Sequence, residues 1–80
     1  MSQWSVYILK CKGGSLYTGI SNNVEERIKR HNLGKGAAYT RSHLPVALVW
    51  SEAQESESAA RKREAQIKGL TRTQKLHLIG

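Results

Sequence analysis

Five polar residues of this sequence belong to types that bind phosphate, hold cations or move protons, namely Tyr7, Tyr17, Arg27, His31 and Glu64. The planar guanidinium of an arginine can clamp phosphate oxygens, and a carboxylate can hold a divalent cation. Tyrosine and histidine side chains can accept, donate or relay protons. Whether these residues act together depends on the faces of the strands and helices that carry them.

The helix-like stretch EERIKRHN brings Arg27 and His31 next to the apolar positions of the same helix. With about 100° of rotation per residue, Val24 and Ile28 share one stripe, and Arg27 and His31 border it. An isolated helix gains nothing from two such side chains one turn apart. Arg27 could extend its stem over the core or pair with a buried carboxylate, with His31 as a packing residue. Alternatively, both face a functional site.

Glu64 shares a helix face with Ala60 and Ile67, so it lies among residues expected to pack on a sheet. A carboxylate in that position is unfavourable unless it is paired, hydrogen-bonded or bound to a cation. An ion pair between Glu64 and Arg27 is the structural interpretation, and a metal site is the functional one. The other charged residues of the helix are expected on a solvated basic surface: Glu57, Arg61, Lys62, Arg63 and Lys68.

Tyr7 and Tyr17 lie in the two strands of a predicted hairpin, and its register decides whether they share a face. A two-residue turn at Gly13 and Gly14 pairs positions whose numbers sum to 27 and separates the tyrosines. A three-residue loop over 13–15 raises the sum to 28 and places them together. Taken singly, each tyrosine is equally explained as a half-buried strand aromatic. Gly19 permits the close approach of another backbone or of a phosphate.

The first half of the chain supplies a hairpin, a helix and a loop to position these residues. WSVYILKC and SLYTGI are β-rich and are joined by glycines. NNVEERIKRHN is a predicted helix that begins at an asparagine cap and ends before Gly34. The segment 34–44 has no clean period, which predicts a surface loop.

The second half supplies one strand and two helices. PVALVWSE is the third predicted strand, and SESAARKREAQIKG is a helix that ends at Gly69. TRTQKLHLI is a further helix, with Thr71 and Gln74 spaced as a capping box. The order β-β-α-β-α-α predicts one small α+β domain over 1–80, with a three-stranded, mainly antiparallel sheet flanked by helices.

The charge balance favours nucleic acid as the partner. Thirteen Lys and Arg against 6 Asp and Glu give a formal net charge of +7 at pH 7, which attracts polyanions. A membrane partner is not expected, because no window has the apolar run of about 18 residues that a spanning helix needs. The single cysteine, Cys11, cannot form an internal disulfide, and the N-terminal stretch is a strand pattern rather than a signal peptide. A cytoplasmic protein is therefore expected.

The sequence lacks the signatures of several other site types. It contains no Walker-type or dinucleotide-binding glycine pattern, so no small-molecule cofactor is expected. His43 and His77 have no partner at zinc-ligand spacing. Cys11 has no predicted histidine or helix N-terminus beside it that would activate a thiolate.

The assembled pattern resembles the GIY-YIG nuclease superfamily. That family has two tyrosine-containing strand triplets, an arginine and a histidine or tyrosine one turn apart in the next helix, and a glutamate in a later helix. The triplets stand here as Val6-Tyr7-Ile8 and Tyr17-Thr18-Gly19, the helix pair as Arg27 and His31, and the glutamate as Glu64. Val6 and Thr18 depart from the family's glycine and isoleucine, and Ile20 stands where some members carry a lysine.

Within the superfamily, the chain is most similar to a small stand-alone bacterial group that remains functionally uncharacterised. The stretches YTGISNNVEERIKRHN, GKGAAYTR and KREAQIKGLTRTQK carry this similarity. The resemblance covers the whole chain and implies a small GIY-YIG domain that acts as a metal-dependent endonuclease on nucleic acid, DNA in preference to RNA. The alternative is a weakly active or inactive nucleic-acid-binding module with the same fold.

The resemblance also implies a role for each site residue. Glu64 would hold one divalent cation, Mg²⁺ or else Mn²⁺, and Arg27 would clamp the phosphate. Tyr17 would act as the general base or orient the attacking water, and Tyr7 and His31 would assist, with His31 as a second candidate for proton transfer. Nucleic acid would be bound by Gly19, Lys35, Arg41, Arg63 and Lys68. Because many such nuclease domains are fused to a DNA-recognition domain, a separate DNA-recognition protein is a possible partner.

Overall fold

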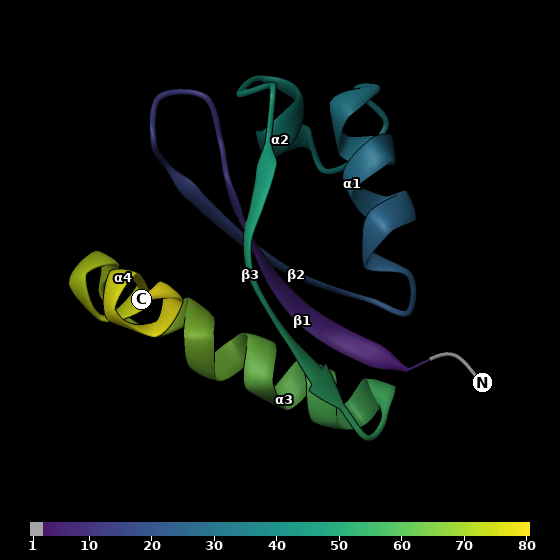
Figure 1. Cartoon of the computed structure of the whole chain (residues 1–80), viewed down its shortest axis with the longest axis vertical. Helices are drawn as coiled ribbons and strands as arrows, with labels where there is room; N and C mark the ends of the chain where they lie inside the picture. The colour runs from purple at the N-terminus through teal and green to yellow at the C-terminus, as the bar shows by residue number, and fades with distance from the viewer. Residues whose placement is uncertain (1–2) are drawn as a thin grey trace.

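The structure, a computed structural model, describes residues 3–80 as a three-stranded sheet with helices on both faces (Figure 1). The elements are β1 (Trp4–Lys10), β2 (Leu16–Ser21), α1 (Val24–Asn32), α2 (Ala38–Arg41), β3 (Ala47–Gln54), α3 (Glu57–Lys68) and α4 (Arg72–Ile79). The predicted fold class and the order of its main elements are confirmed. The short helix α2 is an addition within the segment 34–44, which was predicted as a loop.

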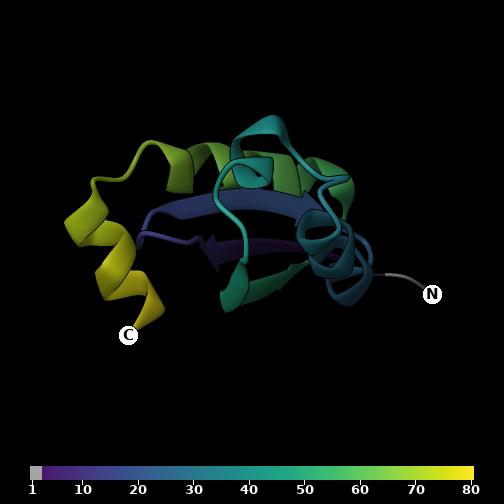
Figure 2. The same cartoon turned by 90° about the horizontal axis from the view of Figure 1, so that it is seen from above.

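The strands are antiparallel and lie in the order β2-β1-β3, so β1 is central and β2 and β3 are the two edges (Figure 2). Side chains of β1 alternate between the two faces. Val6 and Ile8 pack with Ala60 and Ile67 of α3 on one face. On the other face, a second cluster around Tyr7, Leu9 and Cys11 packs against α1. Both faces of β1 are therefore buried, and α1 and α3 lie on opposite sides of the sheet (Figure 1).

The hairpin register differs from both predicted registers. Tyr7 pairs with Gly19 and Lys10 with Leu16, so the paired numbers sum to 26 rather than 27 or 28. The connection is longer than expected: it runs from Cys11 to Ser15 and is closed by a 2.8 Å hydrogen bond from Cys11 N–H to Ser15 O. Because the sum is even, Tyr7 and Tyr17 share the face that α1 covers, as a common site requires.

The ends of α1 are fixed by side chains of asparagine residues. The carboxamide oxygen of Asn23 accepts a 3.2 Å hydrogen bond from Glu26 N–H at the start of the helix. Gly34, at φ +78°, follows the last turn. The amide of Asn32 bonds both the N–H and the C=O of Val46, at 2.8 and 3.2 Å. These two bonds attach the end of α1 to the chain entering β3.

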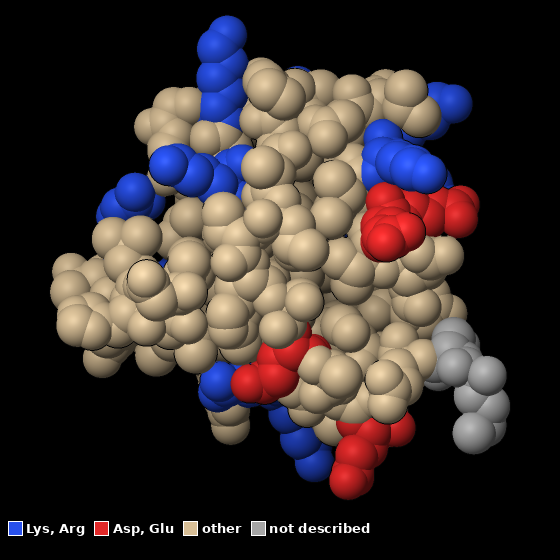
Figure 3. Space-filling view, in the orientation of Figure 1, with Lys and Arg blue, Asp and Glu red and all other residues tan. Residues whose placement is uncertain are grey.

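The charge of the molecule is unevenly distributed over its surface. On the face where β3 lies in front, the centre is largely uncharged, and charged side chains of both signs lie toward the rim (Figure 3). Within the described residues, no helix is long and apolar enough to cross a membrane.

Candidate functional site

A cavity of ≈470 Å³ lies at the β2 edge of the sheet and brings together all five residues singled out by type. Tyr7 and Tyr17 come from β1 and β2, Arg27 and His31 from α1, and Glu64 from α3. Because β2 is an edge strand, residues of helices on both faces of the sheet can reach the same cavity across it. The fold therefore brings five side chains that are far apart in the sequence to one cavity.

The phenol of Tyr7 lies against Gly19 of the neighbouring strand. A Cβ atom at position 19 would stand 2.6 Å from Tyr7 Oη and 2.7 Å from its Cζ. The close approach that Gly19 permits is thus made by the Tyr7 ring. Burial is the main cause that raises the pKa of Tyr7 to about 12; Tyr17 and Glu64 contribute in the same direction, and Arg27 opposes them. Tyr7 is accordingly a neutral hydroxyl at neutral pH.

Gly19→Ala is expected to lower the free energy of unfolding by about 1–3 kcal/mol, because the new methyl group overlaps the Tyr7 phenol. Urea denaturation measures this loss. Gly69→Ala is the matched control, because at position 69 the nearest atom lies 3.5 Å from an added Cβ and no positive φ is required. Equal stability of Gly19→Ala and wild type would contradict the packing of Tyr7 over Gly19.

His31 is almost fully buried, with 2% of its surface exposed, and both ring nitrogens have partners. Nε2 lies 3.2 Å from Tyr7 Oη, and Nδ1 lies 2.8 Å from Thr40 Oγ1. The ring also meets that of Tyr17 edge-on, at a centroid distance of 5.4 Å. Burial, together with the charge of Arg27, lowers the pKa of His31, so the ring is neutral at neutral pH.

The lowered pKa of His31 predicts a loss of stability on acidification. An unfolded histidine titrates near 6.5, and the folded one binds its proton only at lower pH. As pH falls below about 6.5, the unfolded state takes up the proton first, so the free energy of unfolding decreases by up to about 1.4 kcal/mol per pH unit until His31 itself is protonated. Above that pH, His31 contributes no slope.

Urea denaturation between pH 7.5 and 5.5 tests this dependence. His31→Gln should flatten the slope, whereas the control His43→Gln should keep it. The titratable and charged groups that face His31 or share its cavity remain in both variants: Tyr7, Tyr17, Arg27, Lys35, Arg61 and Glu64. An unchanged slope in His31→Gln would assign the pH dependence to other groups.

Arg27 is half-buried, lines the cavity and makes no ion pair with an acidic side chain among residues 3–80. The structural interpretation considered from the sequence, an Arg27–Glu64 ion pair, is therefore wrong. A guanidinium that faces a cavity without a carboxylate partner keeps its donors available for an anion. Its position on α1 follows from the stripe formed by Val24 and Ile28, which pack on the core.

Glu64 has 21% of its side chain exposed, and its Oε2 lies 3.2 Å from Lys68 Nζ one turn later on α3. Among the described residues, no cluster of three or more His, Cys, Asp or Glu could enclose a metal ion. A single carboxylate in an open cavity does not fit a structural zinc site. It does fit Mg²⁺, which keeps several waters and is held by one or two carboxylates together with substrate phosphates.

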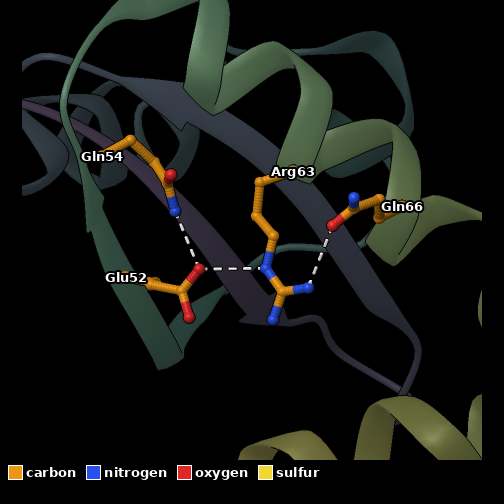
Figure 4. Close-up of polar contacts among 4 residues, drawn as sticks. All are labelled: Glu52, Gln54, Arg63 and Gln66. Atoms are coloured by element: carbon orange, nitrogen blue, oxygen red, sulfur yellow. Dashed lines mark hydrogen bonds and ion pairs between the residues drawn. The ribbon is translucent and has the colours of Figure 1, made fainter.

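The residues predicted to bind nucleic acid fall into two groups. Gly19 and Lys35 line the cavity. Arg41, Arg63 and Lys68 do not. Arg63 Nε donates a 2.9 Å hydrogen bond to Glu52 in β3, and its Nη1 donates to Gln66 (Figure 4). Lys68 contacts Glu64. Arg41 is the last residue of α2 and is exposed.

Several cavity residues were not singled out from the sequence. Arg61 lies three residues before Glu64, on the same face of α3, so helical periodicity could have found it. Its guanidinium pairs with Glu57 at 2.6 Å, and it adds a third cation to the cavity beside Arg27 and Lys35. Gly36 had no such signal, because its closeness to the His31 ring depends on how the chain folds back after α1.

Comparison with known proteins shows the family to which this chain is similar. A family model described as the GIY-YIG catalytic domain matches residues 3–77. A UPF0213 protein of Staphylococcus haemolyticus is 53% identical over 79 residues, covering 99% of this chain and 96% of that protein. A UPF0213 protein of Clostridium perfringens is 61% identical over 74 residues, which cover 92% of this chain and 80% of that protein.

Two solved structures have the same fold. The solution NMR structure of a UPF0213 protein from Bacillus halodurans superposes with a TM-score of 0.61 at 46% identity, covering 99% of this chain and 83% of that one. The solution NMR structure of a protein from E. faecalis gives a TM-score of 0.66 at 39% identity, covering 99% and 88%. The UPF0213 relatives and solved structures support the resemblance to a small bacterial group that the sequence indicated.

Proposed function

Since the chain belongs to the GIY-YIG family, we propose that it is a metal-dependent endonuclease that hydrolyses phosphodiester bonds in nucleic acid, DNA in preference to RNA. The observation that carries this proposal is that half-buried Arg27 lines the same cavity as Glu64 without pairing with it. A purely structural arginine and glutamate in one cavity would gain most by pairing with each other.

Glu64 is the residue that would hold the cation, with Mg²⁺ as the best fit and Mn²⁺ as a substitute. When bound, a divalent cation neutralises charge on the phosphate and on the departing oxygen. Within the described residues, the cavity offers this ion one carboxylate, which leaves most of its coordination to waters and phosphate oxygens.

Arg27 would bind the non-bridging phosphate oxygens through two parallel N–H donors, and Lys35 and Arg61 would add positive charge around the same phosphate. Tyr17 lines the cavity without a hydrogen-bond partner for its hydroxyl among residues 3–80, so it is free to orient the attacking water. These contacts would hold the phosphate and the water in line.

Tyr7 and His31 would together accept the proton of that water. Tyr7 is a neutral phenol whose oxygen lies 3.2 Å from His31 Nε2. The oxygen can take a proton from water while the original phenolic proton passes to the histidine. Every proton is accounted for: the water becomes hydroxide, Tyr7 remains neutral and His31 becomes an imidazolium.

The double variant Lys35→Ala/Arg61→Ala is expected to weaken nucleic-acid binding and to reduce its salt dependence. Each lost phosphate contact should lower the slope of log K against log salt by roughly 0.7–0.9. Binding of a fluorescent oligonucleotide at several salt concentrations measures the slope. Arg41→Ala/Arg63→Ala is the matched control, since these two cations lie outside the cavity. A larger reduction in the control would move the binding surface away from the cavity.

The test of the proposed function is cleavage of a labelled panel of duplex, branched and single-stranded DNA and RNA. Each substrate is incubated with Mg²⁺, with Mn²⁺ or with a chelator, using wild type and Glu64→Ala prepared in parallel. Metal-dependent cleavage that Glu64→Ala lacks is the expected result. Equal cleavage by both proteins would indicate a contaminant or another site, and binding without any cleavage would favour the nucleic-acid-binding module.

A further inference from the structure

A continuous chain of hydrogen bonds leads from the cavity into the core of the protein. Tyr7 Oη lies 3.2 Å from His31 Nε2, and His31 Nδ1 lies 2.8 Å from Thr40 Oγ1. Thr40 Oγ1 in turn lies 2.9 Å from the carbonyl oxygen of Ala37. Thr40 is completely buried, at 0% exposure, although no role was expected for it from its residue type. The series of hydrogen bonds therefore ends on the main-chain carbonyl of Ala37, which can accept a hydrogen bond but cannot donate one.

The donor and acceptor of each bond follow from this fixed end. A carbonyl oxygen can only accept, so the single hydroxyl proton of Thr40 is donated to Ala37. Thr40 Oγ1 must then accept from His31, which requires a proton on Nδ1. In a neutral imidazole a proton on Nδ1 leaves Nε2 as an acceptor, so Tyr7 donates to Nε2.

We propose that Thr40 is a positioning residue that holds neutral His31 in its Nδ1–H tautomer and so keeps the Nε2 lone pair directed at the Tyr7 hydroxyl. This inference deepens the proposed nuclease function and rests on it for its catalytic consequence. The tautomer itself is a property of the folded protein and does not depend on any activity.

The tautomer decides whether Tyr7 can take a proton from water. With Nε2 as acceptor, the phenolic proton points inward and the oxygen lone pairs remain available toward the cavity. A water proton can then move to Tyr7 Oη as the phenolic proton moves to Nε2. The resulting imidazolium has an acceptor for each N–H, because Thr40 still accepts from Nδ1. In the opposite tautomer, Nε2–H would donate to Tyr7 and could accept nothing.

The ring is also held sterically in the orientation that this tautomer needs. A Cβ atom at Gly36 would overlap Nδ1 of His31, so the backbone of residue 36 lies directly against the ring edge. Thr40 reaches the same nitrogen from the short helix α2. The helix α2 thus brings one hydroxyl to the Nδ1 side of the histidine ring.

Thr40→Val and Thr40→Ser test the proposal. Valine keeps the shape of threonine without an acceptor, and serine keeps the hydroxyl. Ring ¹⁵N chemical shifts, measured above the pH at which His31 titrates, should report Nδ1–H in wild type and in Thr40→Ser. In Thr40→Val they should shift toward Nε2–H. An Nε2–H tautomer in the wild type would overturn the proposal even if no variant folds.

Cleavage kinetics provide the second measurement. Thr40→Val should lower kcat by about 10–100-fold with little change in KM, by analogy with the loss of partners that orient metal-binding histidines. Thr40→Ser should recover most of that loss. A wild-type cleavage rate in a Thr40→Val protein whose tautomer has changed would also overturn the proposal. If the wild type does not cleave at all, the proposed nuclease function fails, and the NMR result still decides the tautomer.

Discussion

Glu64→Gln is expected to abolish metal-dependent cleavage, with a loss of at least about 10³-fold in kcat. Glutamine has nearly the same shape as glutamate, so the packing of α3 is retained while the only carboxylate that lines the cavity among residues 3–80 loses its charge. A bound cation stabilises the transition state by several kcal/mol, and every 1.36 kcal/mol corresponds to a tenfold change in rate. Mn²⁺ binding, followed by electron paramagnetic resonance, should be lost in parallel.

Glu55→Gln is the matched control for this variant. Glu55 is exposed, lies just before α3 and makes no ion pair among the described residues. It should retain both cleavage and Mn²⁺ binding. The free energy of unfolding of Glu64→Gln should change by less than about 1 kcal/mol, because its exposed partner Lys68 contributes little. Retention of Mn²⁺ binding by Glu64→Gln would remove Glu64 from the metal site.

Arg27→Ala is expected to reduce cleavage by on the order of 10³-fold or more, while the fold is retained. A guanidinium that stabilises charge on a transferring phosphoryl group is worth 10³–10⁵ in kcat in other phosphoryl-transfer enzymes. Arg27 makes no ion pair among residues 3–80. Its removal therefore leaves no buried charge without a partner, and stability should change by less than about 1 kcal/mol.

Two further substitutions separate the charge of Arg27 from its geometry. Arg27→Lys keeps the charge but loses the two parallel donors, so it should recover only part of the rate. Lys29→Ala removes an exposed cation from the same helix and should cleave like wild type. If Arg27→Ala cleaved at the wild-type rate, Arg27 would have no part in the mechanism. In that case the phosphate would have to be bound by Lys35 or Arg61.

Much of the fold could be predicted from the sequence because the signals are local. The caps at Asn23 and Thr71, together with the glycines that end α1 and α3, define the helices without reference to the rest of the chain. The β-rich composition of WSVYILKC similarly predicts the strand β1, and the structure then buries both of its faces. The helix α2 was missed, since four residues without an apolar period carry no such signal.

The hairpin shows the limit of local prediction. Gly13 and Gly14 predict a reversal of the chain, but the pairing register of the strands depends on the length of the loop. A shift of one residue in that register moves each side chain to the other face of the sheet. The sum of 26 was not foreseen, and only the tertiary structure places Tyr7 and Tyr17 together. The packing of Tyr7 over Gly19 then shows why residue 19 has no side chain.

By itself, the sequence determined which residues can do chemistry and on which helix face each lies, since both follow from residue type and from the 3.6-residue repeat. It did not determine whether Arg27 and Glu64 pair with each other, or which ring nitrogen of His31 carries the proton. Those depend on distances between segments far apart in the chain. Glu64 reaches the cavity because β2 is an edge strand, and His31 is fixed because α2 brings Thr40 to its Nδ1. Only packing in three dimensions brings these groups together.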